Sequence, residues 1–419
     1  MTQNQKALLV GVNLNNQAHF EYTMEELKNL ADACHIDVVG EVAQNLSRIN
    51  RSHYIGKGKI QETVQLIKYT DADVVIFNDE LSPSQIRNLE EELDREVIDR
   101  TMLILDIFAR RAKTREAQLQ VEVANLKYML PRIIGQNESL GRQGGGSGLK
   151  NRGSGETKLE LDRRKIEERI AALNKELEGL VTQRETQRSQ RKKSGIPTVS
   201  LVGYTNAGKS TIMNALVKTF NQSLDKQVFE KDMLFATLDT SVRKINLPNN
   251  RSFLLTDTVG FVDKLPHHLV KAFRSTLEET ATADLLIHVV DYSNSHHKEH
   301  IDVTIKTLKD LGVENIPTIY AYNKSDLTSI DAPKVDDNKL YLSAKHDVGI
   351  NELIEMICGE VFNDNVHCDM LIPFEEGSLV SYFNEHANVL STSYEYNGTK
   401  LELECQMSDF EKYQEYVVE

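Results

Sequence analysis

A phosphate-binding loop pattern lies between a strand-like segment and a helix-like segment near the middle of the chain. Residues 203–210 read GYTNAGKS, which matches G-x-x-x-x-G-K-[ST]. In such a loop the backbone N–H groups converge on phosphate oxygens, Lys209 reaches the β- and γ-phosphates, and the Ser210 hydroxyl is a ligand of Mg²⁺. The pattern predicts a nucleotide site that contains Gly203, Tyr204, Thr205, Asn206, Ala207, Gly208, Lys209 and Ser210.

Three further segments follow in the order that a GTP-binding domain requires. A D-x-x-G pattern begins at Asp257, which would hold Mg²⁺ through water, and it ends at Gly260, whose N–H would sense the γ-phosphate. An N-K-x-D pattern ends at Asp326, which can accept hydrogen bonds from the N1–H and amino groups of guanine. We therefore expect GTP or GDP, rather than ATP, bound by Asp257, Thr258, Val259, Gly260, Asn323, Lys324, Ser325, Asp326, Ser343, Ala344 and Lys345.

Two positions bear on hydrolysis. Phe261 follows the D-x-x-G pattern, where signalling GTPases commonly carry a glutamine that orients the attacking water, and a phenyl ring can neither donate nor accept that hydrogen bond. Either a partner completes the site and intrinsic turnover is slow, or Phe261 is a core residue and another group of the chain orients the water. The side-chain carbonyl of Asn206 could help to bind K⁺ beside the phosphates, where an arginine finger would act.

A switch residue is expected between the phosphate loop and the D-x-x-G pattern. Thr237 is the best candidate, because its hydroxyl can complete the Mg²⁺ shell when γ-phosphate is present, and Thr240 is the competing position. The expected Mg²⁺ ligands are therefore Ser210 and Thr237, and the expected catalytic groups are Lys209, Thr237 and Gly260.

Apolar segments precede each of these patterns, as a parallel α/β sheet requires. Residues 198–202 read TVSLV and run directly into the phosphate loop, while residues 211–216 continue as a helix. Because an open α/β sheet binds ligands at the carboxyl ends of its strands, the patterns predict a P-loop GTPase domain at residues 196–363. The remaining residues, 364–419, predict a small α+β domain with strands at Ser391–Tyr396 and Lys400–Gln406.

The first 113 residues predict a separate parallel α/β domain. Its strands are expected at Ala7–Leu14, Val38–Gln44, Asp73–Phe77 and Glu96–Ile98. Capping boxes at Thr23 and Ser82 predict two helix starts, the first helix running to about Ala33. Gly56-Lys57-Gly58-Lys59 precedes a helix expected at Ile60–Tyr69; it could hold a phosphate, but plain turn chemistry is the commoner origin of such a segment.

Residues 114–195 predict a long helical hairpin. One helix should run from Arg115 to Leu130 and end at Pro131, and a second, charge-rich helix should run from about Glu156 to Lys192. The glycine-rich loop at 141–155 has one apolar residue, and residues 142–193 hold 14 Lys/Arg against 8 Asp/Glu. A basic, glycine-rich tip can follow an irregular phosphate surface, so RNA contact is favoured over an inert linker, with Arg142, Lys150 and Arg152 as the contacts.

Composition limits the class of protein. A net charge of −14 argues against a protein that coats nucleic acid with its whole surface, and no DNA partner is expected. The sequence has no apolar run long enough to span a membrane and no signal-peptide pattern at the N-terminus. Its four cysteines have no paired spacing, which suits a reducing cytosol. We expect a monomeric, cytoplasmic, multidomain α/β protein.

The chain resembles the HflX family of ribosome-associated GTPases along nearly its whole length. Besides the phosphate loop, the likeness rests on FATLD at 235–239 and on DTVGFVDKLPHHLVKAFRSTLEE at 257–279. Outside the GTPase domain it rests on residues 103–132 and on GETKLELDRR at 155–164. Ser154 stands where proline is expected in the family's R-G-P-G-E run, which puts the rigidity of the loop in doubt.

The resemblance implies functions that the residues alone do not give. Members of the family bind the large ribosomal subunit in the GTP state and can split stalled or idle ribosomes, with the hairpin loop near the peptidyl-transferase region. The family's pattern gives Ser210 and Thr237 as Mg²⁺ ligands and adds nucleotide contacts from Phe235, Ala236, Thr237, Leu238 and Asp239.

Two other functions stay open on the sequence. Some members of the family also use ATP through the N-terminal domain, and here only Gly56–Lys59 could support an ATP-driven RNA-remodelling motor. A GTP-dependent assembly scaffold would bind the same nucleotide but would show no stimulation of hydrolysis by ribosomes.

Overall fold

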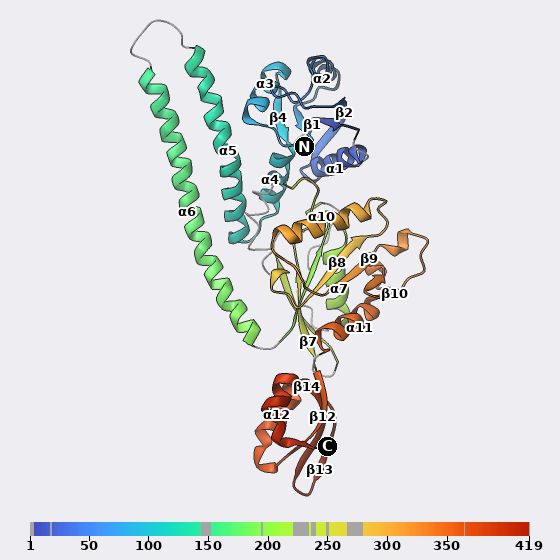
Figure 1. Ribbon diagram of the computed structural model, residues 1–419. Coiled ribbons are helices and arrows are strands. Elements are labelled where there is room, and N and C mark those ends of the chain that lie inside the picture. The colour runs from blue at the N-terminus through green and yellow to red at the C-terminus, as the bar shows by residue number, and fades with distance from the viewer. Residues whose placement is uncertain are drawn as a thin grey trace. The chain divides into compact units, whose positions relative to one another are not determined.

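The computed structural model describes residues 4–16, 19–143, 152–193, 196–220, 234–235, 240–248, 251–265, 280–363 and 365–418 (Figure 1). These residues form two compact units. The first contains the described residues up to 186 together with 234–235 and 262–265, and the second contains the others. The division into four domains inferred from the sequence stays a prediction. No helix in the described ranges is both long and apolar enough to cross a membrane.

A four-stranded parallel sheet forms the centre of the N-terminal region, as predicted. Its strand order is β2-β1-β3-β4, and residues of β1 and β3 are fully buried because helices cover the sheet. The elements are β1 (Gln5–Leu14), α1 (Phe20–Ala33), β2 (Ile36–Leu46), α2 (Lys57–Thr70), β3 (Val74–Phe77), α3 (Pro83–Leu93), β4 (Glu96–Asp99) and α4 (Arg100–Arg111).

One of the two predicted capping boxes is present and the other is wrong. Ser82 accepts a hydrogen bond from the Gln85 N–H, and the Gln85 side chain accepts one from the Ser82 N–H. Thr23 lies inside α1, which begins at Phe20. The buried Thr23 hydroxyl donates to the Phe20 carbonyl and accepts from the Asn78 side chain. Its hydrogen bonds therefore serve packing rather than a helix end.

The Gly56–Lys59 turn opens α2. The Gly56 N–H donates to Gln44 Oε1 at 2.9 Å, and Lys59 Nζ lies 2.7 Å from Glu62 Oε2. These partners belong to ordinary turn and helix chemistry, so the contacts give no support to a phosphate site there.

Two long helices, α5 (Arg115–Gln143) and α6 (Arg152–Lys193), form the predicted hairpin (Figure 1). Their shared core includes Leu119, Val123 and Leu173, and Arg115 forms an ion pair with Glu176 across it. The predicted end of the first helix at Pro131 is wrong, because α5 continues to Gln143.

Anchors on both sides of Pro131 explain this continuation. Tyr128 Oη donates to Asp99 Oδ1 at 2.5 Å, and the Arg132 guanidinium donates to Asp99 Oδ2 at 3.1 Å. Proline removes one backbone hydrogen bond, and these tertiary contacts fix the turns that flank it. The predicted loop at 141–155 is also helical at both ends: Arg142 lies in α5, Arg152 lies in α6, and Lys150 lies outside the described residues.

The second unit contains a seven-stranded sheet of order β10-β11-β9-β8-β5-β7-β6. The five strands from β11 to β7 are parallel, whereas β6 and β10 are antiparallel to their neighbours. Its elements are β5 (Thr198–Gly203), α7 (Lys209–Phe220), β6 (Ser241–Asn246), β7 (Ser252–Asp257), β8 (Leu285–Asp291), α10 (His297–Asp310), β9 (Thr318–Asn323), β10 (Lys334–Asp336), β11 (Lys339–Tyr341) and α11 (Ile350–Val361).

A small antiparallel sheet of order β13-β14-β12-β15 ends the chain, in agreement with the predicted α+β appendage (Figure 1). Its core contains Met370, Ile372, Phe383, Leu401 and Leu403. The elements are β12 (Asn365–Ile372), α12 (Gly377–His386), β13 (Asn388–Glu395), β14 (Gly398–Gln406), α13 (Met407–Lys412) and β15 (Val417–Val418), with a 3-10 turn at Gln414–Tyr416 before β15.

Candidate nucleotide-binding site

The predicted phosphate loop connects the end of β5 to the start of α7. Gly203 has φ +143°, and a Cβ atom there would lie 2.2 Å from the Val289 carbonyl oxygen. Gly208 has φ +97°, and a Cβ atom there would lie 2.1 Å from Asn323 Nδ2. Both positions therefore require glycine, one for the turn out of the strand and one for close approach to the neighbouring loop.

Lys209 is buried at the first position of α7. Its Nζ donates to the carbonyl oxygens of Gly203 at 3.1 Å and Tyr204 at 2.8 Å, so the ammonium group is held inside the loop. Burial lowers the pKa of Lys209 from 10.5 to about 8, and the Asp257 carboxylate acts in the opposite direction. An anionic phosphate in the loop would favour the charged lysine and raise this pKa again.

Ser210 and Asp257 bring two oxygen ligands together beside the phosphate loop. The Ser210 hydroxyl donates to Asp257 Oδ2 at 2.6 Å, although the two residues belong to α7 and to the end of β7. A hydroxyl and a carboxylate at this separation are hard oxygen donors of the kind that Mg²⁺ prefers. The arrangement fits the predicted magnesium site.

The D-x-x-G segment is attached to the phosphate loop by its backbone. The Phe261 N–H donates to the Gly203 carbonyl at 3.2 Å, and the Phe261 carbonyl accepts from the Thr205 N–H at 2.7 Å. Gly260 packs against the loop so closely that a Cβ atom would lie 2.6 Å from Thr205 Cα. The Phe261 side chain is 1% exposed and therefore lies in the core.

The predicted guanine-binding segments are joined to the phosphate loop by Asn323. Its side-chain nitrogen donates to the Ala207 carbonyl at 3.0 Å, and its side-chain oxygen accepts from the Ala344 N–H at 3.0 Å. The Ser343 hydroxyl donates to Asp326 Oδ1 at 2.5 Å. Side chains at the ends of β9 and β11 are thus fixed before any base is bound.

Lys324 has an acidic partner that the sequence did not reveal. Its Nζ lies 2.8 Å from Asp291 Oδ2, at the end of β8, and the Asp291 carboxylate also accepts from the Ser293 N–H and hydroxyl. This pair positions the lysine of the N-K-x-D segment. The only sequence signal was the place of Asp291 at the end of an apolar run.

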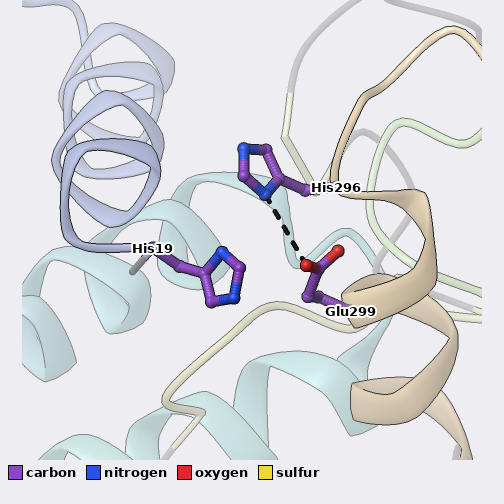
Figure 2. A group of neighbouring side chains, drawn as sticks. All are labelled: His19, His296 and Glu299. Carbon is purple, nitrogen blue, oxygen red and sulfur yellow. Dashed lines mark ion pairs between the residues drawn. The ribbon is translucent and has the colours of Figure 1, made fainter. Parts of the chain in front are cut away.

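Two histidines, His300 and His288, are neighbours of site residues, which no motif indicates. The His300 ring stacks on Tyr204 of the phosphate loop, with centroids 3.8 Å apart and planes 5° from parallel. Burial, together with the charge of Lys209, lowers the pKa of His288 to about 4, so Lys209 has an uncharged neighbour. Figure 2 shows His296, the residue before α10, whose Nδ1 lies 3.9 Å from Glu299 Oε1.

The predicted switch segment is described only in part. Phe235 is buried, and its ring lies edge-on to Phe108 of α4 with centroids 4.7 Å apart. Ala236, Thr237, Leu238 and Asp239 lie outside the described residues.

Three family models match successive parts of the chain. They are described as GTP-binding GTPase N-terminal over residues 21–109, GTP-binding GTPase Middle Region over residues 111–191, and 50S ribosome-binding GTPase over residues 198–324. Among solved structures, a GTP-binding protein from the archaeon Sulfolobus solfataricus in complex with GDP is 25% identical; the match covers 86% of this chain and 99% of that one, with a TM-score of 0.45.

Curated relatives match over most of their length. GTPase HflX of Caldanaerobacter subterraneus subsp. tengcongensis is 46% identical over 391 residues, which cover 93% of this chain and 89% of the relative. GTPase HflX of Escherichia coli K12 is 38% identical over 385 residues, 90% of this chain and 88% of the relative. The chain therefore belongs to the HflX family of GTPases and is a GTP hydrolase.

Proposed function

We propose that this GTPase binds the large ribosomal subunit, separates the subunits of stalled or idle ribosomes, and is released when GTP is hydrolysed. The match of residues 198–324 to a 50S ribosome-binding GTPase model is the observation that carries the proposal. Two relatives that the chain matches over 88% and 89% of their own length are named GTPase HflX.

The helical hairpin supplies a means of reaching into the ribosome. At 1.5 Å per residue, α5 is about 44 Å long and α6 about 63 Å long. The basic residues at the end of the hairpin are Arg142 of α5, Arg152 of α6 and Lys150 between the two helices in the sequence, and we assign them to contacts with rRNA phosphates. An arm of this length with a basic end can enter a space between the subunits that the compact parts of the protein cannot enter.

The nucleotide site holds GTP in the arrangement that its motifs predict. Lys209 and the loop amides bind the phosphates, and Asp326 reads the guanine edge. Ser210 and Thr237 would hold Mg²⁺, with Asp257 acting through water, and the ion when bound offsets negative charge on the phosphate oxygens.

Hydrolysis in the free protein is slow, and the ribosome stimulates it. Phe261 cannot orient water, because its ring is buried and carries no polar atom. The Gly260 N–H and the Thr237 hydroxyl respond to the γ-phosphate, so loss of that phosphate changes the state that the ribosome binds. The missing water-orienting group is supplied when the ribosome is bound.

Sucrose-gradient sedimentation of intact ribosomes tests the splitting function. With GTP or a non-hydrolysable analogue, the monosome peak should shrink and the subunit peaks should grow, whereas GDP should leave the profile unchanged. A monosome peak that stays unchanged with every nucleotide would contradict the proposed splitting of ribosomes. Lys209→Ala serves as the control that cannot use the γ-phosphate.

A second experiment tests the arm. Replacing residues 141–155 with a short glycine-serine turn should keep GTP binding and abolish stimulation by ribosomes. If stimulation survives, the connection is an inert linker.

A further inference from the structure

The C-terminal residues account for most of the net negative charge of the chain. Residues 364–419 contain twelve Asp/Glu and two Lys/Arg, a balance of −10, whereas the whole chain of 419 residues has a net charge of −14. A domain with this charge is repelled by nucleic acid and attracts basic polypeptides. Its preference is therefore opposite to that of the basic hairpin.

A surface pocket of about 300 Å³ lies in this acidic domain, between α12 and the turn that precedes β15. Three phenol rings and two carboxylates contribute to its wall, a combination that suits a cationic side chain because ring faces and carboxylates both attract positive charge. The residues concerned are Tyr382, Tyr413, Tyr416, Glu376 and Glu415.

Neighbouring contacts hold the rings in place. Tyr382 Oη donates to Asp409 Oδ1 at 3.1 Å, and its ring stacks on His386 with centroids 4.5 Å apart. The Tyr413 ring lies 6.0 Å from Tyr382 and 5.4 Å from Phe383, centroid to centroid. A ligand would not have to order these side chains, which lowers the entropic cost of binding.

One cation of the chain already contacts the wall of this pocket. Lys412, the last residue of α13, lines the pocket and places its Nζ 4.6 Å from the centroid of the Tyr413 ring. A hydrogen bond to Tyr413 is the largest of the effects that raise the pKa of Lys412. The structure thus contains an internal example of the contact that an external lysine or arginine would make.

We propose that the pocket of Tyr382, Tyr413, Tyr416, Glu376 and Glu415 receives a lysine or arginine side chain from a basic polypeptide. The partner is a protein segment and not RNA, because the surrounding charge of −10 opposes phosphate groups. If the proposed function is correct, that segment belongs to a protein of the large subunit, and the hairpin and the C-terminal domain contact different components of it. The binding of a cationic side chain itself does not depend on that function.

Fluorescence anisotropy with the full chain and GDP tests the pocket directly. The probe is a labelled peptide in which arginine alternates with serine, and one control probe is the same peptide with glutamate for arginine. The other control probe is a short single-stranded RNA, tested on the chain whose residues 141–155 are replaced by the glycine-serine turn, so that the basic end of the hairpin cannot bind it. We expect the arginine peptide alone to bind in these assays. Equal binding of either control probe would overturn the proposal.

Matched charge reversals separate the pocket from the general acidity of the domain. Glu376→Lys with Glu415→Lys should weaken peptide binding at least about tenfold, because the reversals put like charge beside the ligand. Glu385→Lys with Glu395→Lys changes the net charge of the same domain equally, at exposed positions that do not line the pocket, and should weaken binding less than about threefold. Equal losses of affinity in the two double variants would mean that the peptide is bound by non-specific attraction to the acidic domain and not by the pocket.

The internal cation provides a test in which affinity should rise. Lys412→Ala removes the competing ammonium group and should strengthen peptide binding about threefold, beyond the effect of the altered net charge. Lys400→Ala removes one positive charge from the sheet, where Lys400 pairs with Asp369, and is the control. Equal gains in the two variants would contradict the role of Lys412. Thermal unfolding and GDP binding confirm that each variant is folded.

Sedimentation with isolated large subunits then connects the pocket to the ribosome. With a non-hydrolysable GTP analogue, the Glu376→Lys, Glu415→Lys variant should bind subunits more weakly than the Glu385→Lys, Glu395→Lys variant. If the wild-type chain binds the arginine peptide but no subunits, the pocket stands and the proposed ribosomal function fails. If both paired variants bind subunits as the wild type does, the partner segment is not on the subunit.

Discussion

The side-chain amide of Asn323 donates to the carbonyl oxygen of Ala207 at 3.0 Å, and this contact joins the guanine-binding segment to the phosphate loop. The same side chain accepts from the Ala344 N–H, so one residue links three segments of the site. Base and phosphate recognition therefore share a buried connection.

Removing this connection should weaken the binding of both GTP and GDP. Asn323→Ala leaves the Ala207 carbonyl and the Ala344 N–H without their partner, and each lost buried hydrogen bond costs about 1–3 kcal/mol. We expect the affinities for GTP and GDP to fall together by about tenfold or more, measured with fluorescent nucleotides. Asn338→Ala, which removes an exposed hydrogen bond to the Thr318 carbonyl, is the matched control. A loss confined to GTP would contradict the shared connection.

Phe261 should be a packing residue that takes no part in water orientation. Phe261→Gln places an amide among apolar side chains and should lower the free energy of unfolding by about 1–3 kcal/mol without raising intrinsic hydrolysis. Phe261→Leu should keep both stability and slow turnover. Denaturant unfolding and single-turnover GTP hydrolysis check the two variants. A large gain in rate for Phe261→Gln would place that side chain beside the γ-phosphate.

The two candidate switch threonines can be separated by the same substitution. Thr237→Ala should lower GTP hydrolysis by about tenfold or more while leaving GDP affinity nearly unchanged, because the Thr237 hydroxyl is needed only in the GTP state. Thr240→Ala should have little effect on either quantity. Hydrolysis rates and GDP affinities of both variants decide the matter, and the reverse pattern would assign the switch to Thr240.

Nucleotide affinity should fall in alkaline solution. Lys209 has a pKa of about 8 in the free protein, and the bound phosphate raises it, so binding requires proton uptake above that pH. We expect GDP affinity to be constant below pH 8 and to fall by up to about tenfold per pH unit above it. Lys209→Arg, which stays charged, should remove this dependence. A flat profile for the wild type would show that Lys209 is fully charged before the nucleotide arrives.

The titration of Lys209 should change the stability of the nucleotide-free protein in the opposite direction to its effect on nucleotide affinity. The folded-state pKa of Lys209 lies below its usual 10.5, so the unfolded chain binds more protons between these values. In this window the contribution of Lys209 to the free energy of unfolding of the nucleotide-free protein therefore rises with pH. The result can be measured by denaturant unfolding of the wild type against Lys209→Arg.

Potassium should accelerate hydrolysis through Asn206. At equal ionic strength we expect a faster rate in K⁺ than in Na⁺, because an ion held by the Asn206 side-chain oxygen adds positive charge beside the phosphates. Asn206→Ala should abolish the difference between the two salts. Identical hydrolysis rates of the wild type in K⁺ and Na⁺ would contradict a role for K⁺ at Asn206.

The motifs were predictable because phosphate and guanine recognition depends on short segments with fixed spacing. The phosphate loop and the strands before it are where the sequence indicates, since glycine, lysine and an apolar run leave few alternatives. The predictions made from Thr23 and Pro131 were wrong, because the structure at these residues depends on contacts with distant parts of the chain. Their local signals are overridden by contacts to Asn78 in one case and to Asp99 in the other, both distant in the sequence.

Contacts between distant segments were not predictable. Asp291 holds Lys324, and His300 stacks on Tyr204, but neither pair leaves a spacing pattern in the chain. The acidic pocket was missed as well, because its tyrosines come from α12 and from the last turn and meet only after folding.

The close approach of Gly208 to Asn323 restricts how this site can change. A methyl group at Gly208 would overlap the Asn323 side-chain nitrogen, so Gly208 cannot accept a larger residue while Asn323 stays as it is. Asp326 is free of this restriction, because its hydrogen bond is to Ser343. A redesign of base preference should therefore start at Asp326 and leave the other two residues alone.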